Sequence, residues 1–314
     1  MKKFTIMFVM GLLALVMAAC GNDASGEGSN GEEASSEKIT ISHEYGDTEV
    51  VKNPEKVVVF DFGILDTLDK LDVDVAGVAQ GNIPSYLEKY NGDEYENIGS
   101  LKEPDFEKIS EINPDVILIS GRQAAVYDQL EEIAPTIYLG VDTTNYMESF
   151  KDNMNKVGEL FDKQEQVEEE LAAIDESIAG INEKASSADE KALIILANDD
   201  KISAYGQNSR FGIIHDVFGV PAVDESIEAS THGQNVSFEY VVEQDPDLLY
   251  VVDRGAAIGG DSAAKQLVEN DLVKGTKAYE NDNIVYLDPD YWYLSGGGLV
   301  SVSEMVKQIE SSIE

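Results

Sequence analysis

The sequence predicts an α/β protein with two similar lobes joined by a single long helix. Three observations support this fold class. Short apolar runs alternate with segments of helical periodicity along most of the chain, which is typical of βα units around a mostly parallel sheet. One segment occurs twice at a constant offset of 132 residues, and a long amphipathic stretch lies between the two copies. The length of 314 residues and the apolar content of 43% also suit two packed lobes of ~130 residues each.

The repeated segment reads EKISEINPDVILISGR at residues 107–122 and EYVVEQDPDLLYVVDR at residues 239–254. The chain contains only one further arginine, Arg210, against 61 acidic residues. We therefore expect two related lobes that each place one cation at the end of a strand, an arrangement suited to holding an anion between the lobes. Each copy begins with a glutamate and ends with an arginine: Glu107 with Arg122, and Glu239 with Arg254.

The first residues predict a processing signal. Lys2 and Lys3 precede an apolar run over residues 4–17, which is too short for a permanent membrane helix. Small residues then precede Cys20, the only cysteine of the chain, and this pattern resembles a bacterial lipobox. We predict a signal peptide over residues 1–19 and lipidation of Cys20 as the first mature residue. The alternative is an ordinary cleaved signal with an incidental cysteine.

The segment 20–38 predicts a lipidated cysteine followed by a flexible tether, because it is rich in Gly, Ser and Glu and has no large apolar side chain. An N-terminal lobe is predicted over residues 39–145, and it starts with a hairpin at 39–51 around Tyr45-Gly46-Asp47. Strands are then expected at 57–60, 75–78, 116–120 and 136–139, and helices at 62–71, 103–112 and 123–133.

The inter-lobe helical region is predicted over residues 146–188. Apolar residues keep a three-four spacing from about Gln164 to Lys184, and a helix of this length spans ~30 Å. The alternative is that this helix only covers the first lobe. The C-terminal lobe is predicted over residues 189–314, with strands at 192–196, 202–205, 248–252 and 284–287 and helices at 211–218, 239–243, 263–269 and 299–313.

The net charge of −39 limits the partners that this protein can bind. It argues against nucleic acid, because phosphate binding needs a basic surface, and against unassisted adhesion to an anionic lipid surface. An anionic ligand would have to overcome the overall field, which only a local cluster of cations can do.

The arginines are the candidates for such a cluster. Arg122 and Arg254 each follow a predicted strand, and Arg210 lies in a loop that opens a helix. Ligands of open α/β sheets gather beyond the carboxyl ends of the strands. The planar guanidinium group binds carboxylates and other oxyanions with two hydrogen bonds and stays charged in a pocket. The alternative is a structural salt bridge to one of the many acids.

Aromatic residues and one histidine extend the candidate site. The segment Tyr291-Trp292-Tyr293 is expected in a strand or extended turn, where one face of the triplet, with Trp292 or Tyr293, meets a ligand. The alternative is a core cluster. His232 lies in a polar loop and is a further candidate contact. The histidines lack the spacing of metal ligands and no nucleophile elbow is present, so no metal site and no catalytic site are predicted.

Glu107 and Glu239 open their predicted helices at equivalent points of the repeat. Carboxylates are favourable at helix N-termini in any protein, which is the simpler explanation. The alternative is a matched pair of negative groups for a partner with two basic pockets.

Together, the lipobox, the tether, the two E-x-[IV]-x-E-x-[ND]-P-D copies, the connecting helix and the WYLSGGG stretch resemble class III substrate-binding lipoproteins of bacterial iron–siderophore ABC importers. Segments such as GNIPSYLEKY, GSLKEPDFEKI and THGQNVSFEY are most similar to the petrobactin-type members of Gram-positive bacteria. The resemblance implies two Rossmann-like lobes, a periplasmic-binding-protein-like class III fold and a ligand bound in the cleft between the lobes.

The resemblance also implies a function. Arg122, Arg210 and Arg254 would hold an anionic ferric siderophore, of the catecholate or catecholate–citrate type, with Trp292 as a wall. Iron would contact only the siderophore, so no cofactor is expected. Glu107 and Glu239 would dock on the ABC permease, and through the permease the protein would act with the ATPase. The protein itself would lie on the extracytoplasmic face of the cell membrane. Haem, cobalamin or ferric citrate remain alternative ligands, and an anchored extracellular hydrolase is the alternative from another class. The unusual acidity suggests a saline or alkaline habitat.

Overall fold

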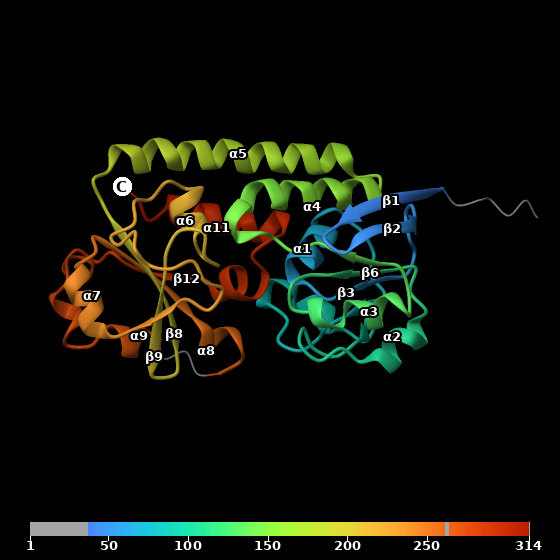
Figure 1. Cartoon of the computed structure of the whole chain (residues 1–314), viewed down its shortest axis with the longest axis horizontal. Coiled ribbons are helices and arrows are strands. Elements are labelled where there is room, and N and C mark those ends of the chain that lie inside the picture. The colour runs from blue at the N-terminus through green and yellow to red at the C-terminus, as the bar shows by residue number, and fades with distance from the viewer. Residues whose placement is uncertain (1–36, 261–263, 314) are drawn as a thin grey trace, which may run out of the picture. The chain divides into compact units, whose positions relative to one another are not determined.

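The computed structural model describes residues 37–260 and 264–313, so the predicted signal peptide, Cys20 and nearly all of the tether lie outside the described residues. Two five-stranded sheets form the centres of the two lobes, and a separate two-stranded hairpin packs on the first lobe (Figure 1). The hairpin confirms the prediction: β1 (Lys38–His43) and β2 (Gly46–Val51) pair antiparallel around a turn in which Gly46 has a φ of 126°.

The sheet of the N-terminal lobe is entirely parallel, with the strand order β5-β4-β3-β6-β7. Its central strands are short and fully buried, as the unbroken apolar runs predict. The strands β4 and β5 are only two residues long, and the sequence gives β5 no apolar pattern. The strands are β3 (Val57–Val59), β4 (Gly77–Val78), β5 (Glu96–Asn97), β6 (Val116–Ile119) and β7 (Thr136–Tyr138).

Two helices of this lobe differ from their predicted bounds. The predicted helix at 103–112 begins only at Phe106, because the Asp105 carboxylate caps it by accepting from Lys108 N. The predicted helix at 123–133 is split into a 3₁₀ turn and a short α-helix, and a 3₁₀ segment over Ser85–Asn91 was not predicted. The α-helices are α1 (Phe62–Lys70), α2 (Phe106–Ile112) and α3 (Tyr127–Glu131), and the split turn is Ala124–Val126.

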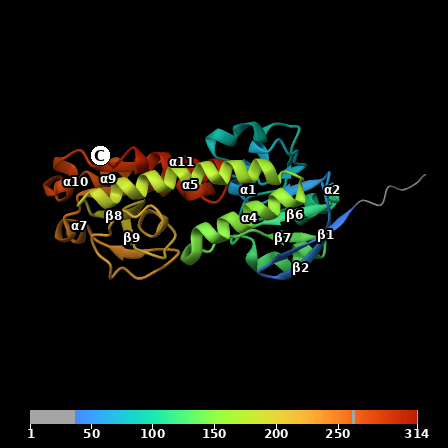
Figure 2. The same ribbon diagram turned by 90° about the horizontal axis from the view of Figure 1, so that it is seen from above.

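The connecting region consists of α4 (Tyr146–Leu160) and the longer α5 (Gln164–Ser187). The apolar residues that predict α5 are the ones that it buries, including Val167, Leu171 and Ile181. In Figures 1 and 2, α5 runs along both lobes and lies beside α4 and α11 (Leu299–Glu310), which agrees with its contacts. The helix therefore joins the lobes rather than covering only the first.

The second sheet has the strand order β10-β9-β8-β11-β12 and is mixed. The strands β8, β11 and β12 are parallel, but β9 runs antiparallel to both of its neighbours. The strand β10 was not predicted, since its sequence Gln-Asn-Val is polar and has no alternation. The strands are β8 (Ala192–Asn198), β9 (Lys201–Tyr205), β10 (Gln234–Val236), β11 (Leu248–Asp253) and β12 (Ile284–Leu287). The shorter helices are α6 (Ile213–Asp216), α7 (Phe238–Gln244), α8 (Arg254–Ala257), α9 (Ala264–Val268) and α10 (Lys277–Glu280).

The sequence repeat forms the same unit in both lobes. The pairs α2 and α7, and β6 and β11, occupy corresponding positions, and each helix ends in a left-handed residue, Asn113 (φ 51°) or Asp245 (φ 43°). Asn and Asp tolerate this conformation better than other residues with side chains. The aspartates after the prolines tie the turn to the neighbouring chain: Asp115 accepts from Glu55 N and Lys56 N, and Asp247 accepts from Lys191 N.

A buried carboxyl group joins α1 of the first lobe to the start of α11. The Asp66 carboxylate accepts from the backbone N–H groups of Val300 (3.2 Å) and Ser301 (3.1 Å) and from the Tyr86 hydroxyl (3.0 Å). A carboxylate at a helix N-terminus satisfies unpaired donors and matches the helix dipole. The two helices approach so closely here that a Cβ at Gly298 would collide with the Gly63 carbonyl oxygen and with Asp66.

Within the described residues, no helix is both long enough and apolar enough to cross a membrane.

We expect Asp66 to make the folded state less stable as the pH rises from about 4 to about 7. Burial raises the pKa of Asp66 to about 7, whereas its ordinary value is 3.8. Between these values the folded protein keeps a proton that the unfolded chain has lost, so this group lowers the free energy of unfolding by ~1.4 kcal/mol per pH unit. Urea unfolding of the wild type and of Asp66→Asn across this range measures the difference in slope. Parallel curves for the two proteins would contradict the assignment.

Candidate anion-binding site

The structure places Arg122 and Arg254 at corresponding ends of the two repeat units. Arg122 follows β6 in the first lobe, and Arg254 directly follows β11 and is the first residue of α8 in the second. Arg210 lies in the loop between β9 and α6. All three side chains are partly buried. Arg122 and Arg254 therefore lie beyond the carboxyl ends of parallel strands, where open α/β sheets bind their ligands.

The three guanidinium groups converge on one residue, Tyr293. Arg122 Nη2 (2.9 Å) and Arg210 Nη2 (2.6 Å) both donate to the Tyr293 carbonyl oxygen, although they come from different lobes. Arg254 Nε donates to the Tyr293 hydroxyl at 3.0 Å. The Arg210 guanidinium carbon also lies 4.2 Å from the centre of the Tyr293 ring, a cation–π distance. The sequence alone did not indicate that one tyrosine would hold all three cations.

The acceptors around these arginines are all neutral. Besides Tyr293, they are the Leu294 carbonyl oxygen, 3.4 Å from Arg122 Nη1, and Asn198 Oδ1, 2.6 Å from Arg254 Nη1. Every ion pair formed among the described residues uses a lysine, and no carboxylate of that part of the chain pairs with an arginine. Within residues 37–260 and 264–313, these arginines therefore form no structural salt bridge, and no carboxylate of that part of the chain neutralises their charges.

The positive charge affects the ionisation of nearby groups. The pKa of Arg210 is lowered, first by burial and then by the charge of Arg122. Burial alone would raise the pKa of the Tyr293 phenol, but the hydrogen bond from Arg254 and the charges of Arg210 and Arg254 outweigh it, so the pKa is lowered. The site therefore favours a negative oxygen even on a side chain that is normally neutral.

Several guanidinium nitrogens remain available for a ligand. Arg122 Nε, Arg210 Nε, Arg210 Nη1 and Arg254 Nη2 make no hydrogen bond to any described residue. No unpartnered side-chain nitrogen of the described residues is buried, so these atoms reach solvent.

The aromatic triplet is not in a strand or extended turn, as its sequence suggested. Residues Asp290–Ser295 form a single π-helical turn that ends at Gly296, which has a φ of 58°. Side chains in such a turn do not alternate between two faces. Tyr291 lies against the Tyr86 ring at 4.6 Å, Trp292 enters the core, and Tyr293 points to the arginines. Short π-helical segments are rare and often mark functional positions.

The expected role of Trp292 as a wall of the site is not supported by its placement. Its side chain is 3% exposed, and its Nε1 donates to Gln308 Oε1 at 3.2 Å. Tyr293 is the aromatic residue beside the cations. The sequence does not show which member of an aromatic triplet the backbone turns toward the core.

The same turn connects the two lobes. Ser85 N and Ser85 Oγ both bond to Asp290 Oδ2, at 2.8 and 2.5 Å, and the Tyr86 hydroxyl lies 2.7 Å from Ser295 Oγ. The Tyr146 hydroxyl donates to the Gly296 carbonyl oxygen at 3.0 Å. The turn that holds the arginines is therefore fixed from the first lobe as well as the second.

The remaining predicted residues lie elsewhere. His232 is exposed in the loop before β10, where only its backbone N–H, donating to Ser230 Oγ, makes a hydrogen bond to the described residues. Glu107 and Glu239 are exposed in the first turns of α2 and α7, which lie in different lobes (Figure 1). Over residues 37–260 and 264–313, no group of three or more His, Cys, Asp or Glu side chains could hold a metal ion.

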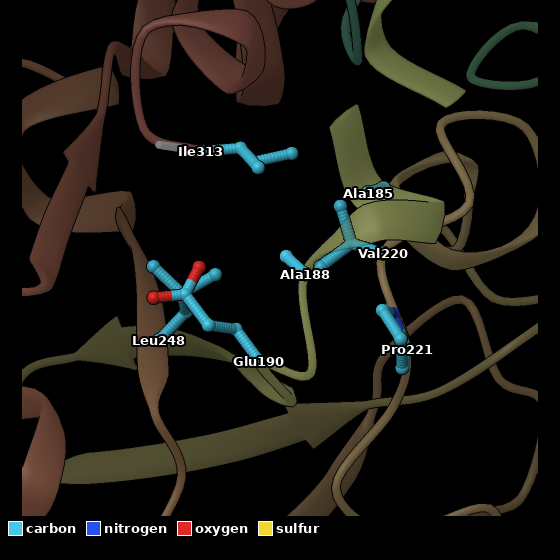
Figure 3. Close-up of a pocket in the computed structure, with 7 residues that line it drawn as sticks. All are labelled: Ala185, Ala188, Glu190, Val220, Pro221, Leu248 and Ile313. Atoms are coloured by element: carbon cyan, nitrogen blue, oxygen red, sulfur yellow. The ribbon is translucent and has the colours of Figure 1, made fainter. Parts of the chain in front are cut away.

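A small pocket near the end of α5 does not belong to this site. Its lining is mostly apolar, with Glu190 as the charged residue, and it includes none of the arginines (Figure 3). Such a lining offers no donor for an anion. The other residues are Ala185, Ala188, Val220, Pro221, Leu248 and Ile313.

The fold and the site define a two-lobed solute-binding protein, and the comparisons with known proteins agree. The chain belongs to the periplasmic binding protein family, whose model matches residues 57–291. It is 52% identical over 318 residues to the petrobactin-binding protein YclQ of Bacillus subtilis, covering 100% of both chains. The ferric-anguibactin-binding protein FatB of Vibrio anguillarum is 30% identical, with 86% of both chains covered.

Solved structures confirm the predicted class III fold. The crystal structure of YclQ matches with a TM-score of 0.87 and 54% identity, and covers 88% of this chain and 99% of its own. The catecholate-siderophore binding protein VctP of Vibrio cholerae matches with a TM-score of 0.84 and 34% identity, and covers 88% of this chain and 100% of its own. These relatives are binding proteins, so the chain is a transport protein rather than an enzyme, and the hydrolase alternative is dropped.

Replacing Arg254 with glutamine should raise the pKa of Tyr293. The substitution removes a hydrogen bond and a positive charge that both favour the phenolate. Tyrosine labelled at Cζ with ¹³C reports each phenol by NMR as the pH is raised, and the Tyr293→Phe variant identifies the signal. The Tyr250 signal serves as an internal control, because that ring is buried against Ser312 in the second lobe. An unchanged titration of Tyr293 would show that Arg254 does not influence it.

Proposed function

We propose that this protein is an extracytoplasmic lipoprotein that captures an anionic ferric siderophore and delivers it to an ABC permease for iron uptake. The observation that carries the proposal is the set of three arginines without carboxylate partners among the described residues, gathered on one turn between the lobes. In a chain of net charge −39, such a cluster gives an anion a local attraction that the rest of the surface opposes.

A petrobactin-like ligand of the catecholate or catecholate–citrate type fits this site best. YclQ, VctP and FatB are named for petrobactin, catecholate siderophores and ferric anguibactin, and they cover most or all of this chain. Arg122, Arg210 and Arg254 would donate to the negative oxygens of the ferric complex, with Tyr293 against its rings. Iron would be bound only through the siderophore, and His232 is a further candidate contact from its exposed loop.

Ferric citrate, haem and cobalamin are the alternative ligands. Ferric citrate shares the negative oxygens that suit arginine, whereas haem usually needs a His or Tyr axial ligand. A thermal-shift panel of the four ligands separates these alternatives, because a ligand that binds only the folded state raises its melting temperature.

Delivery would depend on the repeated glutamates and on the lipid anchor. Glu107 and Glu239 are exposed at equivalent positions of the two lobes, which suits two basic sites on a permease and, through it, action with the ATPase. Lipidation of Cys20 would keep the protein on the extracytoplasmic face of the cell membrane, with residues 21–38 as the tether.

Each of Arg122→Gln, Arg210→Gln and Arg254→Gln should weaken the binding of ferric petrobactin by ~10–100-fold, since a hydrogen bond from a charged group contributes ~1.5–3 kcal/mol. Quenching of tryptophan fluorescence measures the affinity. Lys151→Gln is the matched control, because it removes one positive charge from an ion pair with Asp175 on the connecting helices. If all three arginine variants bind as tightly as the control, the arginine cluster is not the ligand site.

The double variant Glu107→Gln/Glu239→Gln should lose iron uptake but keep its affinity for the ferric complex, because it removes the docking charges and leaves the arginines intact. Uptake of ⁵⁵Fe by cells that carry the variant measures delivery. Glu165→Gln/Glu176→Gln removes two exposed charges from α5 and serves as the control. Normal uptake by the Glu107/Glu239 variant would contradict the docking proposal alone.

A further inference from the structure

Asn198 lies beside Arg254 because of the strand register. It is the last residue of β8, and β8 pairs in parallel with β11 so that Ala197 is opposite Asp253. The next residues along the two strands, Asn198 and Arg254, therefore leave the sheet side by side at its carboxyl edge. The tight turn from β8 into β9 pairs Asn198 with Lys201 and fixes the Asn198 backbone.

The contact between these side chains sets the orientation of the amide. Arg254 Nη1 donates to Asn198 Oδ1 at 2.6 Å. A guanidinium group can only donate, so the amide must present its oxygen to Arg254 and turn its nitrogen away. Asn198 Nδ2 makes no hydrogen bond to any described residue, and no unpartnered side-chain nitrogen in that part of the chain is buried. The amide nitrogen is therefore an open donor next to the arginine site.

The neutrality of this residue matters for the charge of the site. An aspartate at position 198 would have nearly the same shape, and at 2.6 Å it would form an ion pair with Arg254. The two residues that follow, Asp199 and Asp200, are both acidic, in a chain with 61 acidic residues. The amide orients the guanidinium group as a carboxylate would, but it leaves the positive charge uncompensated and adds a donor in place of a negative oxygen.

We propose that Asn198 is a further determinant of ligand binding: its amide oxygen positions Arg254, and its amide nitrogen donates to a negative oxygen of the ligand. This inference rests on the proposed function and specifies the ligand chemistry at one point of the site. Asn198 Nδ2 and the unused Arg254 Nη2 are donors on adjacent side chains. Neighbouring negative oxygens, such as those of a catecholate or of a hydroxycarboxylate, suit such a pair of donors.

Variants of two adjacent residues test this proposal, and their combination separates the position of a carboxylate from the net charge. Asn198→Ala removes both contacts. Asn198→Asp keeps an oxygen for Arg254 but neutralises its charge, and it faces the ligand with a carboxylate in place of the amide nitrogen. Asp199→Asn is the control, since Asp199 has a left-handed backbone (φ 54°) that asparagine also tolerates. The double variant Asn198→Asp/Asp199→Asn keeps the net charge of the wild type and moves one carboxylate by a single residue.

We expect Asn198→Ala to weaken the binding of ferric petrobactin by ~3–10-fold, the loss of one or two hydrogen bonds. Asn198→Asp and the double variant should bind at least about tenfold more weakly than the alanine variant, with a smaller dependence on ionic strength because one positive charge is cancelled. Asp199→Asn should bind like the wild type. Wild-type affinity in Asn198→Asp, or its recovery in the double variant, would overturn the proposal, since the second result would assign the loss to net charge.

A measurement without ligand separates this inference from the proposed function. Neutralising Arg254 weakens its effect on Tyr293, so the pKa of the Tyr293 phenol should rise more in Asn198→Asp than in Asn198→Ala. The ¹³C signal of Tyr293 measures this shift, and thermal unfolding confirms that each variant is folded. If the wild type binds no ferric complex, the proposed function is wrong, and so is the role of Asn198 Nδ2 as a donor to the ligand. If the Tyr293 signal is unshifted in Asn198→Asp, the claim that Asn198 positions Arg254 is wrong, whatever the ligand.

Discussion

The site depends on keeping three guanidinium groups together without a compensating carboxylate from the described residues. Like charges repel, and the pKa of Arg210 is lowered first by its burial and then by the neighbouring charge of Arg122. Neutral acceptors offset this repulsion: the carbonyl oxygen and hydroxyl of Tyr293, the carbonyl oxygen of Leu294 and the amide of Asn198. These dipoles orient the arginines and partly stabilise their charge, but they do not cancel it. In so acidic a chain, the site keeps its positive charge because no carboxylate of residues 37–260 and 264–313 pairs with these arginines.

The π-helical turn makes this arrangement a property of both lobes. Its residues bond to the first lobe through Ser85, Tyr86 and Arg122, and to the second through Arg210 and Arg254. The Asp66 carboxylate lies close by, where it accepts from Tyr86 and from the N-terminus of α11. A movement of one lobe relative to the other would have to break several of these bonds at once. The contacts that position the arginines are therefore also the contacts that hold the lobes together.

Much of the fold and part of the site could be predicted from the sequence. The features that could not be predicted were missed for physical reasons. The repeat located Arg122 and Arg254, because an equal spacing from a Pro-Asp turn puts both at strand ends, and the period of α5 is strong over its whole length. The π-helical turn was missed because its geometry matches neither the period of a helix nor that of a strand. The contact of Asn198 with Arg254 depends on β8 lying next to β11, and strand order is not encoded in local patterns. An asparagine at the end of a buried strand was the available signal, since ligands gather at that edge.

The arrangement of donors also bears on how the protein binds. Holding flexible side chains in place before the ligand arrives reduces the entropy that binding costs. The arginines are held in this way, yet each keeps a nitrogen that is unused by the described residues and open to solvent. At the proposed site, a ligand would therefore add its bonds to those of Tyr293 and Asn198 instead of replacing them. Preorganised donors with unused nitrogens suit a rigid anion that binds without a large rearrangement of the protein. They also favour a ligand with many negative oxygens over one with a single charged group, because one oxygen can bond to only part of the donors.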